Sequence, residues 1–273
     1  EMLDFFHENN VGIGVSLDGL REHQDVTRRD AKGGGTYESV RRNIHKIVDR
    51  SGGVSVISVV SCYNVSDLED ITKGFSDMGV SSVRFSPVYP TSYLGISPDI
   101  NEFSGNLISV FDDYLNRLMN GDRGIRILNL QGLVRTLFRE KKTFNCAKCG
   151  NGDRQPLVAV DIDGSIYPCD FFWGREEYKM GHIDEDMLMD AINSHKNMRH
   201  YRDIGSLEDC LECNWKLFCG AGCPGSSVIS GRGLVQRDPY CQFNKDMLEY
   251  AVSKLPVIYN NGILRDVLGE PKT

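Results

Sequence analysis

The chain has 273 residues, of which 40% are hydrophobic and 25% are charged, as in soluble globular proteins. Acidic and basic residues are mixed along the chain, and the formal net charge of −7 argues against a surface for nucleic acids or anionic membranes. No apolar run approaches the ~20 residues that span a bilayer, and the first residues lack the features of a signal peptide. We therefore expect a cytoplasmic protein with no nucleic-acid or membrane partner.

The chain opens at Glu1, inside a segment with the pattern of an amphipathic helix (Met2, Leu3, Phe5, Phe6), and a strand pattern follows almost at once. This opening is typical of a cut into a longer protein. The alternative is that Met2 is a genuine start preceded by one added residue.

Strand and helix patterns alternate over residues 1–90. Three short apolar runs predict strands, at residues 11–17, 54–60 and 80–85, and the β-rich run at 54–60 is expected to be buried. Apolar residues at helical spacing predict two helices between them, at residues 37–50 and 66–78. Thr36 is expected to cap the first helix, and Gly79 to end the second. This order predicts parallel strands with right-handed crossovers, and three strands cannot close a barrel, so the sheet should have an open edge.

The pattern changes in the second half of the chain. Residues 101–140 are expected to be helical, whereas cysteines, glycines and short segments dominate residues 144–241. We place a domain boundary near residue 141. A last helix is expected at about residues 244–255, followed by a surface tail at residues 256–273.

Eight of the nine cysteines lie between residues 146 and 241: Cys146, Cys149, Cys169, Cys210, Cys213, Cys219, Cys223 and Cys241. Disulfides suit small secreted domains, and this chain is large and has no secretory signal. Two four-thiolate zinc sites would use Cys-x2-Cys pairs such as those at 146/149 and 210/213. Two [4Fe–4S] clusters need the same number of thiolates from more widely spaced positions.

The intervals between the cysteines favour the clusters. Fourteen residues separate Cys149 from Gly164, and four more separate Gly164 from Cys169. The remaining five cysteines follow the pattern Cys210-x2-Cys213-x5-Cys219-x3-Cys223-x17-Cys241. These intervals resemble those of the twin-cluster SPASM domain of peptide-modifying radical S-adenosylmethionine (SAM) enzymes. The resemblance implies two auxiliary [4Fe–4S] clusters.

The same resemblance implies how the ligands divide. The first cluster would be held by Cys146, Cys149, Cys169 and Cys223, and the second by Cys210, Cys213, Cys219 and Cys241. The fourth ligands then cross in chain order, so both clusters would belong to one folding unit that metal binding stabilises strongly. The ninth cysteine, Cys62, is expected to be a small buried hydrophobic residue.

The segment Gly14-Val15-Ser16-Leu17-Asp18-Gly19, with Arg28 and the run from Lys32 to Tyr37, resembles the fourth strand and following loop of the radical SAM barrel. The resemblance implies an α/β fold: the C-terminal half of a partial (β/α)6 barrel at residues 1–140, containing strands 4–6, and a SPASM domain at residues 141–255. It also implies that Ser16 and Arg28 contact SAM. The alternative is that Ser-Leu-Asp-Gly is only a strand that ends in a turn.

The stretch from Gly164 to Phe172, followed by Tyr178–Ile183, is similar to the core motif of the anaerobic sulfatase-maturating enzymes. In that family, the Asp after the Gly-x4-Cys cysteine is the general base, which implies this role for Asp170. The alternative is that Asp170 only caps a turn or orients a cluster ligand.

Two departures from the family pattern stand out. No cysteine precedes Cys62, so these residues lack the Cys-x3-Cys-x2-Cys loop of the SAM-cleaving cluster, and this stretch alone should be unable to cleave SAM. The third [4Fe–4S] cluster would belong to the full-length protein. The pair Cys146-x2-Cys149 is also shorter than in sulfatase maturases, which weakens the assignment of the substrate.

The resemblance implies a radical SAM oxidoreductase that converts a Cys or Ser of a peptide or unfolded sulfatase to Cα-formylglycine. Asp170 would accept the substrate proton, and an electron would leave through the first cluster. The implied electron donor is a protein such as a flavodoxin or ferredoxin. Two alternatives remain: a maturase that forms thioether cross-links in ribosomal peptides, and a truncated, non-catalytic cluster-binding module.

Overall fold

The structure is a computed structural model that describes residues 2–90, 95–138, 151–152, 155–156, 158–194 and 204–270. The chain divides into two compact units. Unit 1 contains Glu1–Val88, Ile96–Arg135 and Tyr250–Thr273, and unit 2 contains Tyr89–Gly95 and Thr136–Glu249. The boundary expected near residue 141 lies outside the described residues. Within the described ranges, no helix combines the length and the apolar character that crossing a membrane requires.

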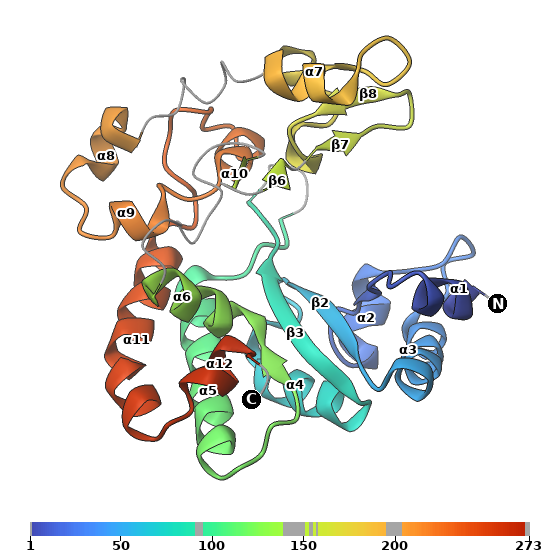
Figure 1. The fold of residues 1–273 in the computed structure, drawn as a ribbon, viewed down its shortest axis with the longest axis vertical. Helices are drawn as coiled ribbons and strands as arrows, with labels where there is room; N and C mark the ends of the chain where they lie inside the picture. Colours follow the sequence, from blue (N-terminus) through green and yellow to red (C-terminus); the bar gives the residue numbers. More distant parts are fainter. Residues whose placement is uncertain are drawn as a thin grey trace. The chain divides into compact units, whose positions relative to one another are not determined.

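A parallel sheet lies at the centre of unit 1 (Figure 1). Its four strands run in the order β1 (Gly14–Ser16), β2 (Val54–Val60), β3 (Val80–Pro87) and β4 (Arg126–Ile127). Gly14 lies opposite Ser55, and Ser82 lies opposite Arg126. The α/β class with parallel strands is therefore confirmed. The two-residue strand β4 was not expected, because it is too short to leave a pattern in the sequence.

Helices connect these strands. In chain order they are α1 (Met2–Glu8), α2 (Arg21–Thr27), α3 (Tyr37–Ser51), the 3-10 helix η1 (Val65–Asp67), α4 (Leu68–Asp77), α5 (Ile100–Met119) and α6 (Leu128–Phe138). Helix α3 packs on β2, α4 packs on β3, and α5 contacts both α4 and β4. The apolar sides of these helices meet the sheet in a core that includes Ile44, Leu68, Ile71, Phe75, Phe85, Leu107 and Phe111. Burying each large side chain contributes about 1.5–3 kcal/mol.

Strand β2 is buried on one face only. Val54, Val56 and Val60 are buried, whereas the side chain of Ile57 on the other face is 47% exposed. The buried strand expected at residues 54–60 is therefore confirmed for one of its two faces. The alternation follows from the strand geometry, which turns successive side chains to opposite faces.

Helix α3 begins after Thr36, as expected, but the hydroxyl of Thr36 does not cap it. That hydroxyl donates to the Arg28 carbonyl at 2.8 Å and accepts a hydrogen bond from Gln24 Nε2 at 3.0 Å. The cap comes instead from Asp25, whose Oδ1 accepts the N–H of Tyr37 at 2.8 Å. A carboxylate from the preceding helix thus satisfies a free N–H group of the first turn.

The C-terminal residues belong to unit 1. Helix α11 (Cys241–Asn260) is longer than the helix expected at 244–255, and a further helix, α12 (Leu264–Leu268), follows it. Ile258, Ile263 and Val267 are buried. The expectation of a surface tail at residues 256–273 is therefore wrong for the described residues, because these apolar side chains pack into unit 1.

Unit 2 has short elements. Strands β5 (Asn151–Gly152) and β6 (Gln155–Pro156) pair, and β7 (Ala159–Val160), β8 (Ser165–Tyr167) and β9 (Gly181–His182) form an antiparallel sheet. The helical segments are η2 (Asp170–Phe172), η3 (Glu176–Tyr178), α7 (Leu188–Ser194), η5 (Ile204–Ser206), α8 (Glu208–Leu211), α9 (Lys216–Cys219), α10 (Pro224–Ile229) and the start of α11. One cluster of buried residues contains Tyr167, Phe172 and Val228, and another contains Leu207, Cys210 and Ala221.

Candidate functional site

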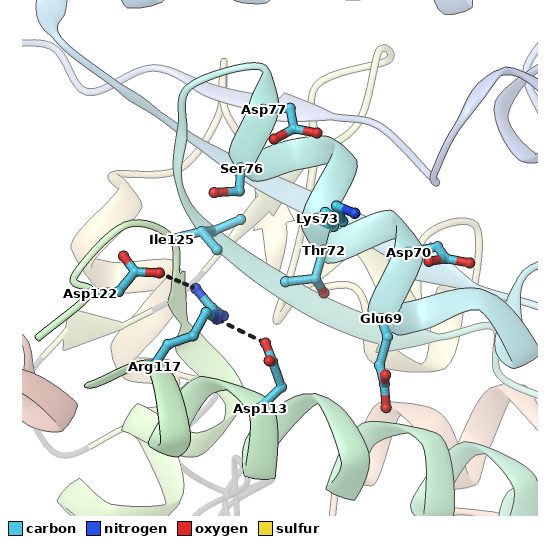
Figure 2. A pocket seen from close by; sticks show the side chains of 10 residues that line it. All are labelled: Glu69, Asp70, Thr72, Lys73, Ser76, Asp77, Asp113, Arg117, Asp122 and Ile125. Atoms are coloured by element: carbon cyan, nitrogen blue, oxygen red, sulfur yellow. Dashed lines mark hydrogen bonds and ion pairs between the residues drawn. The ribbon is translucent and has the colours of Figure 1, made fainter. Parts of the chain in front are cut away.

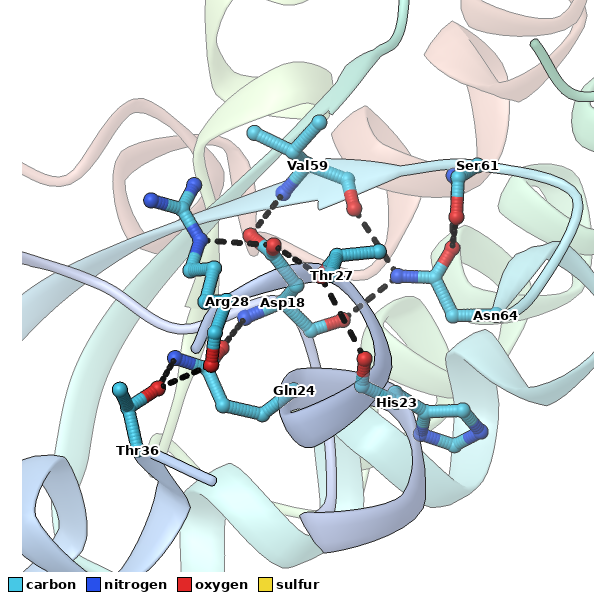
Figure 3. Close-up of polar contacts among 9 residues, drawn as sticks. All are labelled: Asp18, His23, Gln24, Thr27, Arg28, Thr36, Val59, Ser61 and Asn64. Carbon is cyan, nitrogen blue, oxygen red and sulfur yellow. Dashed lines mark hydrogen bonds and ion pairs between the residues drawn. The ribbon is translucent and has the colours of Figure 1, made fainter. Parts of the chain in front are cut away.

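The carboxyl ends of β1 and β2 carry a network of buried polar contacts (Figure 3). Ser16, the last residue of β1, is exposed, whereas Asp18 just beyond it is 4% exposed. One carboxylate oxygen of Asp18, Oδ2, accepts hydrogen bonds from Arg28 Nε at 2.7 Å and from the Thr27 hydroxyl at 3.1 Å. The other oxygen, Oδ1, accepts the N–H of Val59 at 3.2 Å. The buried carboxylate therefore joins both strand ends to the residues that follow α2.

Arg28 is held by one edge of its guanidinium group. Its Nε is bound to Asp18, and its two terminal nitrogens make no hydrogen bond to the residues that the structure describes. The side chain is 39% exposed. A guanidinium group can bind a carboxylate through two parallel N–H groups, so the free nitrogens can receive an anionic ligand. Ser16 and Arg28, predicted from the sequence, thus lie at the strand ends, where parallel α/β folds bind ligands.

Two amide side chains fix the backbone around Asp18. Gln24 Oε1 accepts the Asp18 N–H at 2.8 Å, and Asn64 Nδ2 donates to the Asp18 carbonyl at 2.6 Å and to the Val59 carbonyl at 2.9 Å. Gly19 follows with φ of +153°, and a Cβ there would lie 2.7 Å from His23 Nδ1. Asp18, Gln24 and Asn64 were not predicted from the sequence, where Asp18-Gly19 was interpreted as a simple turn. The available indication was an Asp directly after an apolar strand run.

In unit 2, four cysteines line one cavity with about 360 Å³ of free space, open solvent at its mouth included: Cys210, Cys213, Cys219 and Cys241. They come from α8, the turn after it, the end of α9 and the first residue of α11. Burial raises the pKa of the Cys241 thiol, while Lys245 and Arg237 act to lower it. These are the four residues predicted for the second cluster. Within the described ranges, no three His, Cys, Asp or Glu side chains lie close enough together to hold a metal ion.

Cys169 and Cys223 each precede a short helical segment. Cys169 comes directly before η2, Cys223 comes directly before α10, and η2 packs against α10. The contact is close at Gly225, where a Cβ would lie 2.6 Å from the Phe171 ring. Asp170 is the first residue of η2 and is exposed. Cys146 and Cys149 lie outside the described residues, so the first ligand set stays a prediction.

The backbone conformation explains why glycine occupies the first position of the Gly-x4-Cys motif. Gly164 lies in the turn between β7 and β8 with φ of +88°, and a Cβ there would lie 2.7 Å from the His182 ring. Next to it, the Asp163 carboxylate accepts the N–H of Ser165 at 2.8 Å and its hydroxyl at 3.0 Å. These two hydrogen bonds lower the pKa of Asp163. The turn therefore positions β8, which leads to Cys169.

Cys62 is exposed. Cys62 lies two residues after the end of β2, and its backbone N–H donates to the carbonyl of Ile96 at 2.9 Å. The expectation of a buried hydrophobic residue is therefore wrong, because the buried face of the strand ends at Val60 and Ser61.

A second cavity, with about 820 Å³ of free space, lies between α4 and α5 (Figure 2). Acidic side chains dominate its lining, and Arg117 lies between two of them. Arg117 Nε is 2.8 Å from Asp113 Oδ2, and Nη1 is 3.9 Å from Asp122 Oδ2. The first contact lies within α5 and the second ties α5 to the loop before β4, so Arg117 has a structural role.

Comparisons with known proteins agree with this arrangement. The SPASM family model, an iron–sulfur cluster-binding domain, matches residues 154–214. The chain is 26% identical over 267 residues to the cysteine-type anaerobic sulfatase-maturating enzyme of Clostridium perfringens, covering 94% of this chain and 70% of the relative. It is 22% identical over 249 residues to the serine-type enzyme of Klebsiella aerogenes, covering 89% of this chain and 59% of the relative.

Solved structures show the same likeness. Native anSMEcpe with bound AdoMet and the Cp18Cys peptide matches with a TM-score of 0.77 at 25% identity, covering 95% of this chain and 72% of that one. Streptococcus suis SuiB bound to S-adenosylmethionine matches in fold, with a TM-score of 0.52 at 16% identity, covering 84% of this chain and 54% of that one. The chain is therefore similar in sequence and fold to the anaerobic sulfatase-maturating enzymes, and residues 154–214 match the SPASM iron–sulfur cluster-binding domain.

Proposed function

We propose that these residues are part of a radical SAM maturase that oxidises a Cys or Ser of a protein substrate to Cα-formylglycine. The observation that carries the proposal is the cavity lined by Cys210, Cys213, Cys219 and Cys241, in a chain whose relatives are sulfatase-maturating enzymes. Residues 1–140 would supply strands 4–6 of a (β/α)6 barrel, and residues 141–255 would hold the clusters.

The number and type of the donors fit an iron–sulfur cluster, and binding would bring the four side chains closer together than they lie here. Thiolates are the usual ligands of [4Fe–4S] clusters, and the four-cysteine cavity offers four of them beside Lys245 and Arg237, which favour the charged form of Cys241. The other site would use Cys169 and Cys223, on the two packed segments η2 and α10, together with Cys146 and Cys149. We assign one auxiliary [4Fe–4S] cluster to each set. These clusters would exchange electrons with a protein such as a flavodoxin or ferredoxin.

SAM would bind at the carboxyl ends of the unit 1 strands. Arg28, with two free terminal nitrogens, would bind the methionine carboxylate, and the exposed hydroxyl of Ser16 would bind the ribose. When bound at a cluster held by a Cys-x3-Cys-x2-Cys loop, SAM supplies the radical that removes a hydrogen atom from the substrate Cβ. That loop is not among these residues, so we expect this stretch by itself not to cleave SAM.

Asp170 would act as the general base. Its carboxylate is exposed, so it is open to a substrate thiol or hydroxyl, and it directly follows the proposed cluster ligand Cys169. This position would let Asp170 take the substrate proton while an electron leaves through the adjacent cluster.

The test uses a protein that contains these residues together with the Cys-x3-Cys-x2-Cys loop. We expect it to convert the cysteine of a sulfatase peptide to formylglycine under reducing, anaerobic conditions, as measured by mass spectrometry. Asp170→Asn should lose product by a factor of about 10²–10⁴ while retaining its iron. The control is Asp184→Asn, an exposed residue in the turn after β9. Unchanged turnover of Asp170→Asn would remove this residue from the mechanism.

The second candidate is a maturase that forms thioether links in a ribosomal peptide. The short interval of Cys146-x2-Cys149 favours it, because sulfatase maturases have a longer gap at this position. A cross-linked peptide product, rather than formylglycine, would decide for this function.

A further inference from the structure

Asp238 is a buried acidic residue in unit 2, with an exposed fraction of 3%. Its side-chain Oδ2 accepts the backbone N–H of Cys223 at 2.6 Å, and its Oδ1 accepts the N–H of Tyr240 at 2.8 Å. Its own carbonyl accepts the N–H of Cys241 at 3.0 Å. A single residue therefore holds the backbone at two cysteines that are 18 positions apart in the sequence.

The chain is shaped to bring Cys223 to this carboxylate. The three residues before Cys223 all have left-handed backbone angles, with φ of 72° at Gly220, 64° at Ala221 and 79° at Gly222. A Cβ at Gly222 would lie 2.1 Å from the Cβ of Asp238, so only glycine fits there. Ala221 adopts a conformation that is strained for a non-glycine residue. This turn is the Cys-x3-Cys interval of the sequence motif.

We propose that Asp238 is a positioning residue for both iron–sulfur clusters. The inference rests on the proposed function, in which Cys223 binds the first cluster and Cys241 the second. The carboxylate of Asp238 holds Cys223 directly, and by accepting the N–H of Tyr240 it also fixes the turn in which the Asp238 carbonyl accepts the N–H of Cys241. A carboxylate is required because both of its oxygens accept N–H groups. An Asn side chain has one acceptor oxygen and would turn an NH2 group toward the second N–H.

The experiment compares the anaerobically reconstituted chain with Asp238→Asn and Asp184→Asn. Asp184 is an exposed residue of unit 2 that does not line the four-cysteine cavity, so its variant makes the same charge change away from the proposed ligands. Iron and sulfide content and the EPR spectrum of the reduced protein are measured. Cys223→Ala and Cys241→Ala identify which EPR signal belongs to which cluster.

We expect Asp238→Asn to lose at least half of the iron and to change both EPR signals, whereas Asp184→Asn keeps the wild-type iron content and spectrum. Full loading with an unchanged spectrum, or a change in one signal only, would overturn the proposal. A wild-type chain that takes up no iron and sulfide would instead refute the proposed function.

A second measurement covers the case in which Asp238→Asn does not fold. Hydrogen–deuterium exchange of the loaded wild-type chain should show slow exchange of the N–H groups of Cys223 and Tyr240, because a buried carboxylate accepts both. Exchange of either group at the rate of an unprotected amide would contradict the proposal, whatever the variant does.

Discussion

At the scale of single residues, Arg28 is oriented by a buried carboxylate. Asp18 binds its Nε, the terminal nitrogens make no hydrogen bond to the described residues, and Val59 and Thr27 hold the carboxylate in place. Asn at position 18 would place an NH2 group among these donors, so the guanidinium would lose its fixed orientation. Under the proposed function, in which Arg28 binds SAM, Asp18 would act through Arg28.

This role predicts that a change at Asp18 weakens the binding of SAM but not that of an analogue that lacks the carboxylate. Asp18→Asn should lower the affinity of the chain for SAM about tenfold, the equivalent of one charged hydrogen bond, and leave the affinity for decarboxylated SAM unchanged. When Arg28 is already replaced by Ala, Asp18→Asn should not change further the ratio of the affinities for SAM and decarboxylated SAM. Isothermal titration measures both ligands.

The control for this prediction is Asp25→Asn, which lies in α2 and makes the same change of charge. Asn at this position can still accept the N–H of Tyr37, so this variant should bind SAM as the wild type does. Equal weakening of both ligands by Asp18→Asn would reduce Asp18 to a structural residue. Absence of SAM binding by the wild-type chain would argue against the SAM site itself.

Tyr114 gives a prediction for high pH. Burial raises the pKa of Tyr114 to about 12, against 10.0 for an unperturbed tyrosine. Because the folded pKa lies above the unfolded value, the contribution to stability is fully present below pH 10 and is lost as the pH rises toward 12. The loss is about 3 kcal/mol. Urea unfolding should show that Tyr114→Phe removes this part of the pH dependence.

The matched control is Tyr259→Phe, because the side chain of Tyr259 is 74% exposed. Its unfolding free energy should follow the wild-type curve between pH 10 and pH 12. The same pH dependence in Tyr114→Phe as in the wild type would contradict the assignment to Tyr114.

At the scale of elements, the sequence predicts best what local spacing determines. Strands β2 and β3 and helices α3, α4 and α5 follow from runs of apolar residues and appear close to the expected positions. Strand β4 and helix α12 could not be predicted from local spacing. Each is only a few residues long and is stabilised by residues far away in the chain, β4 by pairing with β3 and α12 by burial of Val267.

The same distinction applies to the candidate sites. The cysteines could be predicted as ligands because the intervals between them form a recognisable pattern in one stretch of the sequence. Asp18 was missed because its partners lie 9, 10 and 41 positions away, and Asn64 lies 46 positions from it. Asp238 was missed for a similar reason, since its contact with Cys223 spans 15 positions. Contacts of this kind depend on the fold and leave no local pattern.

Helix α5 offers an element-scale test. Asp99 precedes its first turn, and Asp99 Oδ1 accepts the N–H groups of Asn101 at 2.9 Å and Glu102 at 3.0 Å. Asp99→Ala should lower the free energy of unfolding by about 1 kcal/mol, because two N–H groups lose their acceptor. Asp99→Ser, which keeps a capping oxygen, should lose much less. Urea unfolding curves with equal midpoints for the two variants would contradict the role of the cap.

At the scale of the whole molecule, the two units differ in what holds them together. Unit 1 has a sheet covered by helices and many fully buried side chains, whereas the described part of unit 2 has short elements and two small groups of buried residues. Small cores of this kind contribute little stability, so bound metal should supply much of it in unit 2. The crossing of Cys223 and Cys241 between the proposed clusters would join the two sites into one folding unit.

The most direct test of this account is the metal content of the anaerobically reconstituted chain. The wild type should contain about eight iron and about eight sulfide ions, as two [4Fe–4S] clusters require. Cys223→Ala and Cys241→Ala should each remove about four iron ions, and the two variants should lose different EPR signals. Zinc in place of iron and sulfide, disulfides among these cysteines, or loss of the same signal in both variants would contradict the account.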